Sequence, residues 1–313
     1  MTSDNAVQDV VLAMKFRGGL LGTGLGDAIG ELAFRRPTRE GLTAEVEASD
    51  VLIYTDDTAM AIGLAESMAV REGLDQTHLG ETFRTNYRRE PWRGYASGPP
   101  TVFSKVEEMG LSYPEAARTL YGGEGSFGNG AAMRIAPLGL TFHAQEDLYE
   151  EARASAEVTH AHPVGVDGAA VQARAVALVV SMKPGGAFPV ERFLDALLDT
   201  ARTATMARKL SSLRDLVADD APPPEAARRL GLGVAVDRSQ PFALYAFLRH
   251  TDSFEETLFC AALNGGDRDT MGAMACAISG GYLGEEGIPA EWRKRLENRT
   301  RIEALATRLA DLV

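Results

Sequence analysis

Residues 55–73 read TDDTAMAIGLAESMAVREG, and this stretch decides the fold class. Met60, Leu64 and Met68 recur four residues apart with alanines beside them, which is the spacing of one apolar face of an α-helix. A threonine suited to N-capping precedes the run, and a glycine suited to ending a helix follows it. The stretch therefore predicts a helix over 58–71.

The same periodicity recurs along much of the chain, whereas alternation of apolar and polar residues is poor. The best strand-like run, 51–54, is too short to build a sheet. We therefore predict an all-α fold, with further helices over 145–158, 166–182, 190–210, 242–263 and 270–283. Turn-rich stretches are predicted at 35–50, 91–101, 121–130, 183–189 and 219–224.

The chain has 313 residues, which is long enough for one large domain or two ordinary ones. Three prolines at 222–224 resemble a linker between domains. However, the acidic residues that suggest a single metal site lie on both sides of these prolines, and one site cannot straddle a free hinge. We therefore predict one compact α-helical domain over residues 1–313.

Charge and cysteine usage limit the classes of function. The formal net charge is −12, so the chain cannot broadly neutralise the phosphates of a nucleic acid or an anionic membrane. A nucleotide-sized ligand needs only a local site and is compatible with this charge. Cys260 and Cys276 lie among apolar residues, which predicts buried, reduced thiols and a cytoplasmic protein. The sequence shows no signal-peptide pattern and no apolar run of about 20 residues, so we expect no membrane partner.

Two short acidic segments adjoin predicted helices: one holds Asp56 and Asp57, the other Asp267 and Asp269. Either segment alone is typical of helix capping, because carboxylates accept from free amides and complement the helix dipole. Together, four carboxylates repel one another unless protons or cations neutralise them. Oxygen ligands of this kind, supported by threonine hydroxyls, suit Mg²⁺, Mn²⁺ or Ca²⁺ better than zinc. Two such ions would balance the four charges and leave positions for water or substrate hydroxyls.

Glycine-rich stretches suggest contact with phosphate. Residues 122–130 lead into a helix-like start at 131–134, and glycines let backbone amides approach a ligand at such a terminus. Residues 94–100 are a second candidate of the same kind. Residues 22–27 are also glycine-rich but match no nucleotide-binding fingerprint. For any one of these stretches, a plain turn is the simpler explanation.

Five motifs occur in order along the chain, at 26–30, 54–58, 125–134, 159–160 and 264–270. In this order and spacing the chain resembles the ADP-ribosylglycohydrolase family, from about residue 16 to residue 284. That family includes dinitrogenase reductase-activating glycohydrolase and the hydrolases of ADP-ribosylserine and ADP-ribosylarginine. The glycine-rich loop is slightly more similar to the ADP-ribosylserine and O-acetyl-ADP-ribose branch than to the nitrogenase-regulating branch.

The resemblance implies an orthogonal multi-helix fold and a binuclear Mg²⁺ centre, in which Mn²⁺ can replace Mg²⁺. By position, the implied metal ligands are Thr55, Asp56, Asp57, Asp267, Asp269 and Thr270. The implied substrate-binding residues, which would hold the diphosphate and its ribose, are Gly98, Ser126, Phe127, Gly128, Asn129, Gly130 and His160. Phe127 would line the adenosine side, whereas the neighbouring His162 is interpreted as a structural histidine.

The implied activity is hydrolysis of the glycosidic bond between ADP-ribose and a modified acceptor, which releases ADP-ribose. The acceptor would be a protein side chain, the acetyl group of O-acetyl-ADP-ribose or an ADP-ribose polymer. Breaking the anomeric bond builds oxocarbenium character and needs a water nucleophile and a protonated leaving group. We expect a cytoplasmic monomer whose partners are ADP-ribose and ADP-ribosylated substrates, with no general binding of nucleic acid.

Two residues depart from the family's pattern. Many relatives carry a functional glutamate seven residues after the aspartate of the first motif, and here that position is Phe34. Glu31 is the nearest replacement and our candidate acid/base, although a solvated glutamate at a helix end fits the sequence equally well. Arg268 stands where relatives carry threonine, and we expect it to pair with a neighbouring carboxylate or contact substrate.

Two other functions fit parts of the sequence. A non-catalytic ADP-ribose-binding protein would explain Phe34 but gives no reason for four clustered carboxylates. A metal-dependent nucleotide phosphohydrolase would explain the carboxylates and the glycine-rich loops. It predicts phosphate release, whereas a glycosidase releases ADP-ribose with the diphosphate intact.

Overall fold

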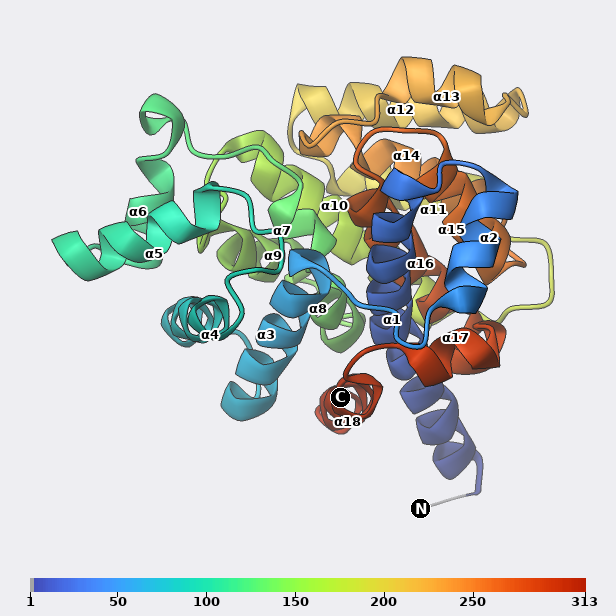
Figure 1. Ribbon diagram of the computed structural model, residues 1–313, viewed down its shortest axis with the longest axis horizontal. Coiled ribbons are helices and arrows are strands. Elements are labelled where there is room, and N and C mark those ends of the chain that lie inside the picture. The colour runs from blue at the N-terminus through green and yellow to red at the C-terminus, as the bar shows by residue number, and fades with distance from the viewer. Residues whose placement is uncertain (1–2) are drawn as a thin grey trace.

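The fold is organised around two helices that touch along their backbones, α1 (Ser3–Arg35) and α16 (Arg268–Leu283). The computed structural model describes residues 3–313. In Figure 1, α1 runs down the middle of the molecule beside α16. Small residues spaced four apart face each other across this contact, because such residues lie on one face of a helix. They are Gly18, Gly22, Gly26 and Gly30 on α1, and Gly272, Cys276 and Gly280 on α16.

This contact requires glycine. A Cβ atom added to Gly26 would lie 2.1 Å from the carbonyl oxygen of Gly272, and one added to Gly272 would lie 2.3 Å from that of Gly26. No side chain fits at such distances, so the two backbones meet directly. Residues 22–27 therefore belong to the middle of a long helix, and the prediction of a turn there was wrong.

Other helices surround this pair. Those that follow α1 are α2 (Arg39–Ala48), α3 (Asp56–Arg71), α4 (Gln76–Arg89), α5 (Gly98–Met109) and α6 (Tyr113–Arg118). The middle of the chain forms α7 (Gly130–Met133), α8 (Ala136–Thr141), α9 (Leu148–Glu157), α10 (Pro163–Val180), α11 (Val190–Thr200) and α12 (Ala204–Ala218). The remainder forms α13 (Pro223–Leu230), α14 (Gln240–Arg249), α15 (Phe254–Leu263), α17 (Ala290–Arg295) and α18 (Arg299–Ala310).

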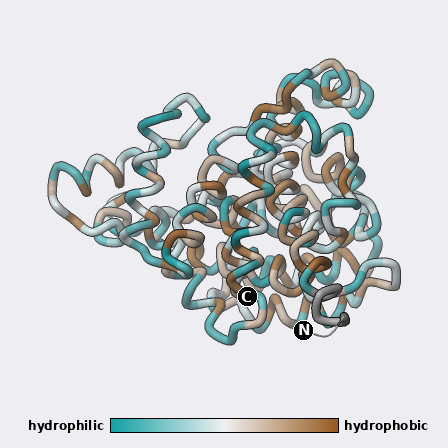
Figure 2. The backbone as a smooth tube through the Cα atoms, turned by 90° about the horizontal axis from the view of Figure 1, so that it is seen from below, coloured by the Kyte–Doolittle hydropathy of each residue, from teal (hydrophilic) through white to brown (hydrophobic). Residues whose placement is uncertain are grey.

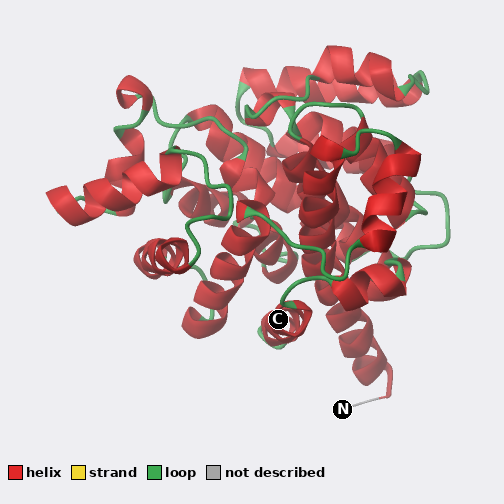
Figure 3. Cartoon of the chain, in the orientation of Figure 1, coloured by secondary structure: helices red, strands yellow, loops and turns green. Residues whose placement is uncertain are grey.

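The all-α prediction is confirmed (Figure 3). Between residues 3 and 313 the chain forms no strand, only two isolated bridges, which join Leu52 to Leu296 and Gly128 to Ala235. One continuous core of buried side chains runs from Phe16 near the start to Leu309 near the end. In Figure 2, apolar segments gather towards the middle of the molecule, and many of the outer loops are polar.

Four of the predicted helices, over 58–71, 145–158, 166–182 and 270–283, are found with shifted ends as α3, α9, α10 and α16. Two others were predicted as single helices and are each broken in two. The 190–210 prediction fails because the buried Asp167 carboxylate accepts from the amides of Arg202 and Thr203, at 2.9 and 2.7 Å, and so interrupts the helix. The 242–263 prediction fails at Ser253, whose hydroxyl accepts from the amide of Glu256 and starts a new helix.

The turn-rich prediction for 35–50 was also wrong, because that stretch contains α2, which Thr38 caps by accepting from the amide of Gly41. Among the described residues, α10 is the one helix whose length and composition would suit a membrane span, but 78% of it is buried inside the fold. That burial is expected of a core helix. Cys260 and Cys276 are buried free thiols, as predicted.

We predict that Gly26→Ala destabilises the fold by about 1–3 kcal/mol, because overpacking forces α1 and α16 apart. Gly281→Ala is the matched control: it is also a buried helical glycine, but its Cβ would lie 3.6 Å from its nearest neighbour. There, alanine should be neutral or stabilise the helix by up to about 1 kcal/mol. Urea denaturation midpoints test the pair, and equal shifts for both variants would contradict the proposed role of the contact.

Candidate active site

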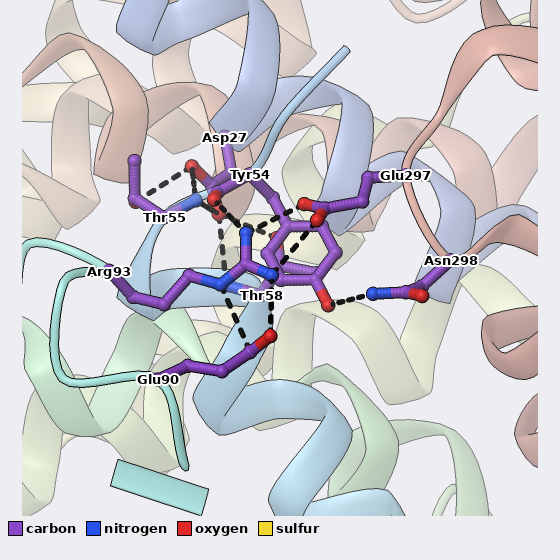
Figure 4. A network of polar contacts seen from close by, with 8 residues as sticks. All are labelled: Asp27, Tyr54, Thr55, Thr58, Glu90, Arg93, Glu297 and Asn298. Atoms are coloured by element: carbon purple, nitrogen blue, oxygen red, sulfur yellow. Dashed lines mark hydrogen bonds and ion pairs between the residues drawn. The ribbon is translucent and has the colours of Figure 1, made fainter. Parts of the chain in front are cut away.

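Asp27 on α1 connects this helix to the start of α3. Its carboxylate is fully buried and accepts hydrogen bonds from four donor groups at the start of α3. The amide and hydroxyl of Thr55 donate at 3.0 and 2.8 Å, and those of Thr58 donate at 3.0 and 2.6 Å (Figure 4). Thr55 is the N-cap of α3, as predicted, but its hydroxyl is directed to Asp27 and does not cap its own helix.

The two acidic segments meet beside Asp27. Asp56 and Asp57 lie in the first turn of α3, while Asp267 is the N-cap of α16 and Asp269 lies in its first turn. Burial first, and then the charges of Asp27 and Asp267, raise the pKa of Asp56 to about 7. Burial, Asp267 and Asp27 likewise raise the pKa of Asp269 to about 8. Burial followed by repulsion from Asp27 and Asp269 raises the pKa of Asp57 well above its ordinary value.

The arrangement fits divalent cations in three respects. Carboxylates crowded together at low exposure are stabilised by positive charge. The Oδ1 atom of Asp57 is buried and has no hydrogen-bond partner, as expected of an atom that binds a ligand instead. The donors are carboxylates and the hydroxyls of Thr55 and Thr270, which suit hard cations such as Mg²⁺.

No three carboxylate, imidazole or thiolate groups of the described residues converge as a ready cage for a single ion. The donor set is instead spread over two helix starts, so threonine hydroxyls, water or substrate would have to complete each shell. The structure thus brings the six predicted ligands to one place, and their binding of cations stays a prediction.

A cavity of about 280 Å³ opens on this cluster. Its lining includes most of the predicted substrate-binding residues, namely Gly98, Ser126, Gly128, Asn129, Gly130 and His160, together with Asp56, Asp267, Asp269 and Thr270. Asn129 links the two groups, because its side-chain amide donates to Asp267 at 2.6 Å. Phe127 is not part of the lining: its ring is 47% exposed and packs against His162, with ring centroids 5.1 Å apart.

His160 lies buried under the glycine-rich loop. Burial, and then the charge of Arg134, lower the pKa of His160 to about 3, so the imidazole is neutral. The hydroxyl of Thr159 lies 2.7 Å from Arg134 Nη1 and 2.8 Å from His160 Nδ1. The hydroxyl accepts from Arg134, because a guanidinium only donates, and we assign its own proton to the bond with Nδ1, because this hydroxyl has no other acceptor among the described residues. In this arrangement the imidazole proton is on Nε2.

That Nε2 atom faces the loop. A Cβ atom added to Gly130 would lie 2.9 Å from it, and one added to Gly128 would lie 3.5 Å away. His162, by contrast, caps α10, and its Nδ1 atom accepts from the amide of Val164 at 3.1 Å. Its interpretation as a structural histidine is therefore confirmed.

Glu31 lines a second, larger cleft of about 830 Å³, which opens on the other side of the acidic cluster. Thr55, Asp56 and Asp269 line the same cleft. Glu31 is half-buried on α1, one turn beyond Asp27, and its charge contributes to the raised pKa of Asp269. Glu31 therefore lies beside the acidic cluster, and its role as acid/base stays a prediction. Phe34 lines the rim of this cleft.

A family model described as ADP-ribosylglycohydrolase matches residues 9–313 of this chain. The chain belongs to the ADP-ribosylglycohydrolase family. ADP-ribosylhydrolase ARH3 of Bos taurus is 34% identical over 339 residues, which cover 94% of this chain and 92% of that protein. The Homo sapiens ADP-ribosylhydrolase ARH3 is 34% identical over 340 residues, with the same coverage of 94% and 92%.

A solved structure described as an ADP-ribosylglycohydrolase-related protein complex has the same fold, with a TM-score of 0.73 and 25% sequence identity. The match covers 96% of this chain and 98% of that one. With these relatives, the chain is an ADP-ribosyl hydrolase, a glycosidase-type enzyme. The hypothesis of a non-catalytic binding protein is therefore not supported.

Two residues of this ADP-ribosyl hydrolase differ from our expectations. Arg268 does not pair with a carboxylate; its Nη1 atom donates to the backbone oxygen of Ala262, away from the cluster. Arg134 was assigned no role, yet its fully buried guanidinium supports the glycine-rich loop by donating to the carbonyl of Gly130 at 3.2 Å and to Thr159. In the sequence, this role is indicated only by the position of a long, charged side chain among the apolar residues of 131–134.

Removal of divalent cations should make the stability of the enzyme depend on pH. The pKa values of Asp56 and Asp269, about 7 and about 8, lie above the ordinary carboxyl value of 3.8. Between about pH 4 and pH 8 the folded protein therefore binds more protons than the unfolded chain, and stability falls as pH rises.

Thermal unfolding of chelator-treated enzyme should accordingly give a lower midpoint at pH 8 than at pH 5. Added Mg²⁺ should raise the midpoint most at pH 8, where the carboxylates are ionised. A midpoint that rises with pH in chelator, or that Mg²⁺ leaves unchanged at pH 8, would count against the cation site.

Proposed function

We propose that this enzyme is a Mg²⁺-dependent hydrolase that cleaves the glycosidic bond between ADP-ribose and a modified acceptor and releases free ADP-ribose. The acceptor would be a protein side chain, an acetyl group or an ADP-ribose polymer. One observation carries the proposal: the acidic cluster lies where two cavities meet, and Asp56, Gly94 and Asp269 line both of them. A bond held at this junction would have ADP-ribose on one side and the acceptor on the other.

Two Mg²⁺ ions, or Mn²⁺ in their place, would be held by the six residues Thr55, Asp56, Asp57, Asp267, Asp269 and Thr270. When bound, such ions would offset the repulsion of the carboxylates, orient the ribose hydroxyls and polarise a water molecule. The unpartnered Oδ1 atom of Asp57 and the raised pKa values of Asp56 and Asp269 support this assignment.

The cavity under the glycine-rich loop would hold the ADP-ribose. The neutral imidazole of His160 can donate from Nε2 to a ribose or phosphate oxygen, because Thr159 occupies its Nδ1 atom. Arg134, fixed beneath, adds positive potential without reaching the surface. The glycines keep this cavity open, since any side chain at Gly130 would strike the imidazole.

Glu31 would be the carboxylate that moves a proton. As the glycosidic bond breaks, positive charge builds on the ribose, and the neighbouring carboxylates stabilise it. Glu31 would protonate the leaving atom or take a proton from the attacking water. Glu31 and Phe34 are three residues apart on α1 and therefore lie on one helix face. Glu31 can thus supply, from a neighbouring turn, the carboxylate that Phe34 lacks.

We also propose that the protein is a cytoplasmic monomer. Its two cysteines are buried and free, which agrees with a reducing compartment.

Product analysis tests the activity. Wild-type enzyme with Mg²⁺ should release intact ADP-ribose from peptides ADP-ribosylated on serine or arginine, or from O-acetyl-ADP-ribose, as identified by mass spectrometry. Asp267→Asn should lower the rate by at least about 10²-fold and weaken Mg²⁺ binding, because it removes a charge from the cluster. Phosphate release would instead indicate a phosphohydrolase, and near-normal rates in the variant would refute the metal assignment.

Glu31→Gln should lower kcat by about 10²-fold or more while ADP-ribose binding changes little, because an amide cannot transfer the proton. Calorimetric titration with ADP-ribose measures the binding, and single-turnover kinetics measure the chemical step. Phe34→Glu in the Glu31→Gln background should recover part of the rate, since both positions line the same cleft. An unchanged rate in Glu31→Gln would place the acid/base elsewhere.

A further inference from the structure

Four exposed apolar side chains frame the larger cleft. Phe34, Val51, Ile53 and Trp92 line it, and they are 47%, 50%, 60% and 71% exposed. They come from three separate segments: the end of α1, the connection before α3 and the connection between α4 and α5. Single exposed apolar residues are normal on a protein surface, whereas a group of them around a cleft marks a binding surface.

The walls that carry these side chains are held rigidly. The nearly buried guanidinium of Arg93 donates to the backbone oxygen of Tyr54 at 2.9 Å and to Glu297 at 2.6 Å, and it lies 4.2 Å from the centre of the Tyr54 ring (Figure 4). Asn298 fixes the hydroxyl of Tyr54 at 2.7 Å. Trp92 and Ile53 are sequence neighbours of these two clamped residues, so the rim is ordered before any ligand arrives.

The backbone of the same wall is also fixed. The amide of Leu52 donates to the carbonyl of Arg295 at 2.8 Å, and the amide of Glu297 donates to the carbonyl of Leu52 at 3.0 Å. These two bonds hold Val51 and Ile53 against the C-terminal part of the chain. A ligand that packs on them would therefore bind with little loss of conformational entropy in the wall.

The cleft lies on the acceptor side of the reaction. It shares Asp56, Gly94 and Asp269 with the cavity under the glycine-rich loop. If ADP-ribose occupies that cavity, whatever is attached to it projects into the cleft. The volume of about 830 Å³ is near the upper end of small-molecule pockets. An acetyl group would leave most of it empty.

The charges of the cleft favour a polypeptide over a nucleic acid or an ADP-ribose polymer. Either polymer brings phosphates, which need unpaired cations. Of the two arginines in the lining, Arg93 is already paired with Glu90 and Glu297. Only Arg35 remains, and the carboxylate of Glu31, which is not one of the proposed metal ligands, repels phosphate in the same cleft. An uncharged backbone with apolar side chains avoids this repulsion and matches the rim.

We propose that this cleft binds the polypeptide that carries the ADP-ribose, and that an apolar side chain next to the modified residue packs against Trp92, Ile53 and Phe34. The inference rests on the proposed function, because it assumes that the scissile bond lies at the acidic cluster. It adds a sequence preference in the acceptor: an apolar neighbour of the modified residue is bound at the rim.

The test compares two substrates with the same linkage. One is a peptide ADP-ribosylated on serine or arginine with leucine beside the modified residue; the other is that modified amino acid alone, with blocked termini. Trp92→Ala should lower kcat/KM for the peptide by about 10-fold, mainly through KM, because aromatic anchors dominate such contacts. Turnover of the blocked amino acid should change by less than about twofold.

Val70→Ala is the matched control, since Val70 is 68% exposed at the far end of α3 and lies outside both cavities. It should leave both substrates unaffected. A second test replaces leucine in the peptide by alanine. This change should lower kcat/KM of the wild-type enzyme several-fold and have little effect in Trp92→Ala.

Equal losses on both substrates, no loss on either, or indifference of the wild-type enzyme to the leucine would overturn the inference. So would preferential cleavage of an ADP-ribosylated oligonucleotide or of an ADP-ribose polymer. Failure of the proposed function gives a different result: the wild-type enzyme would release ADP-ribose from none of these substrates.

Discussion

The backbone contact between α1 and α16 is the constraint on which the rest of the structure depends. At Gly26 and Gly272 the helices approach until no Cβ atom fits between them. This approach brings Asp27, in the first part of the chain, beside Asp267 and Asp269, near its end. Asp27 then holds the start of α3 through Thr55 and Thr58, which adds Asp56 and Asp57 to the same buried volume.

Bringing these carboxylates together destabilises the fold electrostatically. Burial and mutual repulsion raise the pKa values of Asp56, Asp57 and Asp269, so the cluster is unfavourable unless it binds protons or cations. In the proposed function, a carboxylate that stays negative beside the ribose would stabilise a developing oxocarbenium ion. A site selected for stability alone would not retain so many buried carboxylates.

Two buried arginines support the two sides of the junction. Arg134 lies under the glycine-rich loop and, through Thr159, orients the imidazole of His160. Arg93 lies under the rim of the larger cleft and joins the segments that carry Ile53 and Trp92. The acidic cluster between them would meet the bond that is cut. In the proposed function, the cavity under the glycine-rich loop would hold ADP-ribose and the larger cleft would hold the acceptor.

The sequence by itself determined the helical class, because the periodicity of 58–71 and similar stretches is local. It also identified both acidic segments and the glycine-rich loop, because these stretches can be recognised from their residue types without knowledge of the fold. Only the tertiary structure decided the role of residues 22–27: glycines favour turns locally, but here they let two distant helices touch. Tertiary contacts likewise broke the helix at Arg202 through Asp167. They also placed Glu31 in the lining of a cleft, whereas the sequence left open whether it was a catalytic residue or a solvated one. Such outcomes depend on residues far away along the chain, which no local pattern contains.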